Sequence, residues 1–91
     1  MTRKEYLVAL KALCAANWST FVAEREKGGV HVEAARVNEV HRRIADAKTI
    51  GELALTMDGL GWRRAGMMHM LVRVVVPDLP RDEFLALASL P

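Results

Sequence analysis

The residues best suited to metal or nucleophilic chemistry in this 91-residue chain are its three histidines and its single cysteine. His31, His41 and His69 are far apart, and none has a second ligand at the spacings of HExxH, HxxxH or CxxC zinc motifs. Cys14 falls on the apolar stripe of a predicted helix, where a cysteine usually serves as a small buried hydrophobe. No glycine-rich loop follows a strand, and there is no serine elbow. The sequence therefore predicts a non-enzymatic protein without a metal site or a cofactor.

The residues most suited to binding lie within residues 49–76. A short capped helix, a turn with glycine and a longer helix are expected there, which has the outline of a helix-turn-helix unit. In that unit the second helix enters the major groove of DNA. On a helical wheel of residues 62–76, aromatic and basic residues share one arc with a glycine and a methionine. The arc consists of Trp62, Arg63, Gly66, His69, Met70 and Arg73. If this arc faces solvent, it offers contacts to phosphates, to base edges or to another protein.

Three observations weigh against DNA as the partner. The turn at residues 58–61 is longer than the helix-turn-helix unit usually has. The arc contains arginines but no Asn, Gln, Ser or Thr that would read bases. The net charge is only +2, from 13 basic and 11 acidic residues, which is low for a phosphate binder. We therefore favour packing of this arc within the domain over binding to another protein, and binding to another protein over binding to DNA. The DNA alternative would use Arg63, Arg64, His69 and Arg73.

Two further features concern contacts with protein. Trp18 lies beside polar residues in the first predicted helix. A core position is favoured for it, and the alternative is an interface anchor, because tryptophan is enriched at binding hot spots. Met67, Met68 and Met70 suit an adaptable binding groove, yet they fill gaps in a core equally well.

The elements that position these residues are all predicted to be helices. Residues 2–27 form a long helix that Thr2 and Glu5 cap at its start and Gly28 ends. Residues 30–48 form a second helix with a solvated charged face, on which Glu39 and Arg43 pair. The glycine turn between them predicts an antiparallel hairpin. The apolar stripe of the first helix is Leu7, Leu10, Cys14, Trp18 and Phe21. That of the second is Val30, Ala34, Val37, Val40 or His41, Ile44 and Ala47.

The rest of the chain completes an all-α bundle of four to five helices in a single domain, residues 1–91. Thr49 and Glu52 form a capping box for a short third helix. Residues 62–76 form a central apolar helix, and residues 82–89 a short closing helix. The residues predicted to be nearly fully buried are Leu10, Phe21, Val37, Ile44, Leu53, Leu71 and Val72.

Composition indicates what kind of function such a bundle serves. Apolar residues make up 52% of the chain, above the ~45–50% usual for globular proteins. A small domain cannot easily bury that much apolar surface, which predicts a homodimer or a docking face for another protein. Lys11 interrupts the first apolar run, so we expect neither a signal peptide nor a membrane span. A single cysteine suits a reducing compartment, and the protein is expected to be a cytoplasmic regulator or adaptor.

Overall fold

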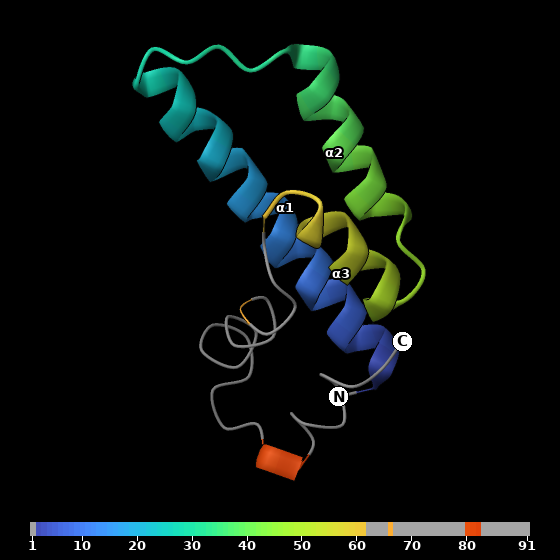
Figure 1. Cartoon of the computed structure of the whole chain (residues 1–91). Coiled ribbons are helices and arrows are strands. Elements are labelled where there is room, and N and C mark those ends of the chain that lie inside the picture. Colours follow the sequence, from blue (N-terminus) through green and yellow to red (C-terminus); the bar gives the residue numbers. More distant parts are fainter. Residues whose placement is uncertain (1, 62–65, 67–79, 83–91) are drawn as a thin grey trace.

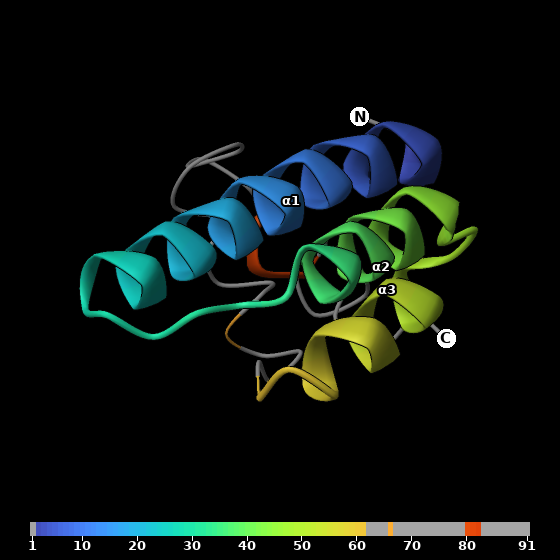
Figure 2. The same ribbon diagram turned by 90° about the horizontal axis from the view of Figure 1, so that it is seen from above.

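The computed structural model describes residues 2–61, residue 66 and residues 80–82, which are coloured in Figure 1. These residues are all-helical and contain no strand; they form α1 (Arg3–Lys27), α2 (Ala34–Asp46) and α3 (Ile50–Asp58). Helices α1 and α2 run in opposite directions, and α3 packs against both of them (Figures 1 and 2). The predicted all-α class is thus confirmed for this part of the chain. The fourth and closing helices, predicted for residues 62–76 and 82–89, lie outside the described residues except at Gly66 and Asp82.

Helix α1 begins and ends where the local sequence predicts. The Thr2 side chain accepts a hydrogen bond from the Glu5 backbone N–H at 3.2 Å, and the Thr2 N–H donates to the Glu5 carboxylate at the same distance. This reciprocal pair satisfies backbone donors that the first turn of a helix leaves unpaired. The backbone hydrogen bond from Thr2 is also the main reason why the pKa of Glu5 is lowered. At the other end, the Gly28 N–H donates to the Glu24 carbonyl at 3.1 Å, and Gly29 turns the chain at φ +84°.

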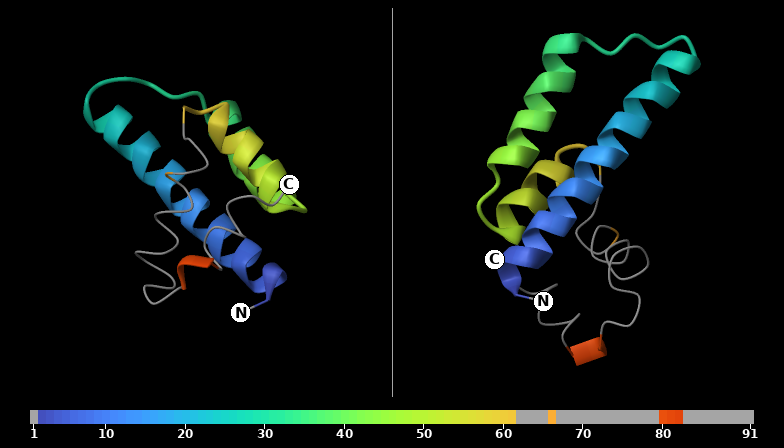
Figure 3. Two further views of the ribbon diagram at one scale, coloured as in Figure 1. Left: turned by 60° about the horizontal axis from the view of Figure 1, so that its bottom comes forward. Right: turned by 180° about the vertical axis from the view of Figure 1, so that it is seen from behind.

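The connection between α1 and α2 is longer than predicted. The second helix was expected over residues 30–48, but α2 spans Ala34–Asp46. Val30 donates its N–H to the Arg25 carbonyl at 2.9 Å and is 49% exposed, so its expected place on the buried stripe is wrong. The reason is geometric: α1 and α2 diverge toward this end, as Figures 1 and 3 show, and non-helical residues must bridge the gap.

Helix α3 has the predicted start with one altered contact. The Thr49 side chain accepts the Glu52 N–H at 3.1 Å, as an N-cap should. The Glu52 carboxylate, however, accepts the N–H of Lys48 at 2.6 Å, one residue before the N-cap, where a capping box would use Thr49 itself. Gly59 closes the helix, and Gly61 has a φ of +87° that favours glycine. The short third helix is therefore confirmed at both ends.

One cluster of buried apolar side chains joins the three helices. Its members from α1 are spaced four residues apart, which is slightly more than one helical turn, so the row slants across the helix axis. Helices that pack through such rows cross at an angle, and this agrees with the divergence of α1 from α2. The cluster contains Tyr6, Leu10, Cys14, Trp18 and Val22 from α1, Val40, Ile44 and Ala47 from α2 and its C-cap, and Ile50, Leu53, Ala54 and Met57 from α3.

This slanting row corrects part of the predicted core. Phe21 was expected on the buried stripe, but it is 37% exposed because the row continues from Trp18 to Val22. Val37 is only half-buried, since it lies on the first turns of α2, where the helices have begun to separate. Leu10, Ile44 and Leu53 are buried as predicted, whereas Leu71 and Val72 lie outside the described residues.

Helix α1 carries more apolar surface than its contacts with the core bury. By length and composition alone, residues Lys4–Lys27 would suffice to cross a membrane, with a mean hydropathy of 1.3 over the most apolar stretch. A leader sequence and a core helix of a soluble protein meet the same requirement. Only 22% of that stretch is buried. Much of the apolar surface of α1 is therefore left uncovered, including Val8 at 63% exposure.

Candidate protein-docking surface

Three side chains form a continuous stack along one side of α1, which we call the aromatic ladder: Trp18, Phe21 and Arg25. The Trp18 and Phe21 rings are stacked with centroids 5.6 Å apart and planes inclined by 18°. The Arg25 guanidinium carbon lies 4.9 Å from the centroid of the Phe21 ring, within the range of a cation–π contact. The steps of three and four residues put these side chains next to one another on the helix. The ladder runs from a buried indole to an exposed guanidinium.

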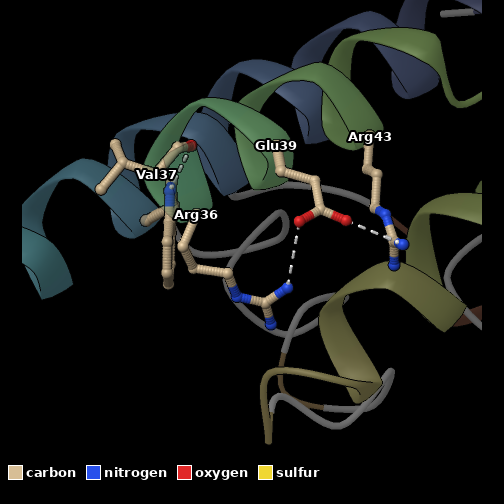
Figure 4. A network of polar contacts seen from close by, with 5 residues as sticks. Arg36, Val37, Glu39 and Arg43 are labelled. Atoms are coloured by element: carbon tan, nitrogen blue, oxygen red, sulfur yellow. Dashed lines mark hydrogen bonds and ion pairs between the residues drawn. The ribbon is translucent and has the colours of Figure 1, made fainter. Parts of the chain in front are cut away.

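The inner end of the ladder is fixed by the second helix. Trp18 is 5% exposed, and its indole N–H donates to the Val37 backbone carbonyl at 3.2 Å, the contact drawn at Val37 in Figure 4. A buried indole usually finds such a partner for its N–H. Because packing and this hydrogen bond hold Trp18 in place, Phe21 stacks on a rigid support. The ladder therefore presents an aromatic ring at the diverging end of the hairpin with little conformational freedom to lose.

A second contact between α1 and α2 joins a serine to a histidine. The Ser19 hydroxyl lies 3.2 Å from Nε2 of His41, and Ser19 is exposed. A hydroxyl next to an imidazole is the starting arrangement of nucleophilic catalysis, which also needs a third group to orient the ring. Among the described residues, no carboxylate contacts His41. In this geometry the pair serves as a link between the two helices.

Lys11 makes the third link, at the other end of α2. Its ammonium group donates to the carbonyl of Ala45 and, at 3.1 Å, to that of Ala47. These carbonyls belong to the C-terminal end of α2, where a helix has unpaired acceptors and a partial negative charge. The one charged residue inside the apolar run of α1 thus caps the neighbouring helix.

Cys14 has the environment of a core residue. Its side chain is 1% exposed, and burial raises the pKa of its thiol to about 11. A thiol with so high a pKa supplies almost no thiolate near neutral pH, and thiolate is the reactive and metal-binding form. The predicted role of Cys14 as a small buried hydrophobe is confirmed. The described residues also contain no group of three or more His, Cys, Asp or Glu side chains that would hold a metal ion.

The outer face of α2 carries charges in partly exposed ion pairs. Figure 4 shows the Glu39 carboxylate between two arginines, 3.0 Å from Arg43 and 3.8 Å from Arg36. The predicted Glu39–Arg43 pair is therefore present, and exposed pairs of this kind contribute little to stability. An open hollow between α2 and α3 continues this face. It is lined by charged side chains of both signs, Arg42, Arg43, Asp46 and Glu52, together with the uncharged Ala47 and Thr56.

Of the sequence-predicted binding residues, the structure describes Trp18. Trp18 occupies the core position that the sequence favoured. The other candidates fall outside the described residues: Trp62, Arg63, Arg64, His69, Met70 and Arg73. Sequence reasoning missed Phe21 and Arg25 as surface candidates because it assigned Phe21 to the core. Their spacing from Trp18, three and seven residues, was the available signal.

No family model, curated protein or solved structure matches this chain.

Proposed function

We propose that the chain is a small non-enzymatic regulatory or adaptor protein that binds another protein through the aromatic ladder end of α1. The observation that carries this proposal is the 37% exposure of Phe21 between a buried tryptophan and an arginine. Aromatic residues and arginine are the types that dominate binding energy at protein interfaces. Arg25 takes part in no ion pair among the described residues, so its guanidinium donors are available to a partner.

The exposed part of Phe21 is large enough to matter for affinity. An aromatic side chain buries about 150–250 Å² when fully covered, so the exposed 37% amounts to roughly 70 Å². At about 25 cal/mol per Å², covering this area contributes about 2 kcal/mol. Such a gain corresponds to more than a tenfold change in affinity. Removing the ring should therefore weaken binding measurably.

Quantitative affinity capture tests the proposal. The purified chain, its Phe21→Ala variant and a Leu55→Ala control are immobilised and exposed to lysate of the native cells. Leu55 is 75% exposed on α3, so its truncation removes comparable apolar surface away from the ladder. A specific partner is retained by the parent and by the control and is reduced about tenfold or more by Phe21→Ala. Circular dichroism first establishes that the three proteins are equally helical. Equal capture by all three contradicts the proposed site.

A second copy of the chain is one partner that this proposal includes, because the apolar excess also predicts a homodimer. Sedimentation equilibrium at micromolar concentration distinguishes a dimer from the 10.1 kDa monomer. A dimer through the ladder dissociates in Phe21→Ala and persists in Leu55→Ala. A monomer at every concentration removes the homodimer and leaves a different protein as the partner.

A further inference from the structure

We draw no further inference here: the strongest candidate, the outer face of α1 that carries the exposed Val8, Ala12 and Ala16, is an apolar helix face, and nothing in the described part of the structure shows what covers it.

Discussion

Truncating Leu10 to alanine tests the packing of the three helices most directly. Leu10 is 0% exposed and lies in the row of buried side chains on α1. The substitution removes three carbon atoms, each contributing about 0.8 kcal/mol of transfer free energy, and it leaves a cavity that neighbouring side chains fill only in part. The expected loss of unfolding free energy is therefore about 2–5 kcal/mol.

That loss is large for a chain of this length. Proteins have roughly 0.05–0.15 kcal/mol of stability per residue, which amounts to about 5–14 kcal/mol here. A domain of 60–100 residues loses about 4–8 °C of melting temperature per kcal/mol, so Leu10→Ala should melt at least ~8 °C below the parent. Thermal and urea unfolding followed by circular dichroism measure the effect.

The matched control is the same chemical change at an exposed leucine. Leu55 is 75% exposed on α3, and Leu55→Ala should change the unfolding free energy by less than about 0.5 kcal/mol. The comparison separates burial from the intrinsic effect of replacing leucine by alanine in a helix. Equal melting temperatures for Leu10→Ala and Leu55→Ala would refute the assignment of α1's buried side.

Three further predictions concern a lysine, the cysteine and the DNA alternative. Lys11→Met keeps an apolar stem but removes the hydrogen bonds to the end of α2, so it should lower the free energy of unfolding in urea by about 1 kcal/mol. Lys48→Met, at an exposed lysine, should lower it by almost nothing, and equal losses in the two variants would contradict the capping role. At pH 8 the thiol of Cys14 should react with a disulfide reagent only as fast as the chain opens, and rapid reaction of the folded protein would overturn this. The free energy of unfolding should fall as pH rises from about 9 to about 11, because burial raises the pKa of the thiol in the folded state and the thiol of the unfolded chain ionises first. If the chain binds DNA instead of protein, gel shifts should weaken steeply with salt and weaken further in Arg63→Ala and Arg73→Ala; no shift at low salt removes this alternative.

The boundaries of α1 and α3 were determined by the sequence alone. The caps at Thr2 and Thr49 and the glycines after α1 and α3 act through hydrogen bonds between residues three or four apart. Such signals depend on no distant part of the chain, so they can be recognised before the fold is known. The i, i+4 ion pair between Glu39 and Arg43 was predictable for the same reason.

The start of α2 and the choice between Phe21 and Val22 were decided only by tertiary structure. Both side chains are apolar and adjacent, and periodicity permits either one to follow Trp18 toward the core. The angle at which α2 crosses α1 selects Val22 and leaves Phe21 at the surface, and the same divergence keeps residues 30–33 out of the helix. The crossing angle also brings the Trp18 indole to the Val37 carbonyl, a contact between residues 19 positions apart. A crossing angle results from the packing of whole helices. The spacing of Trp18, Phe21 and Arg25 therefore indicates that they are neighbours on one helix, but it does not specify that Phe21 is exposed.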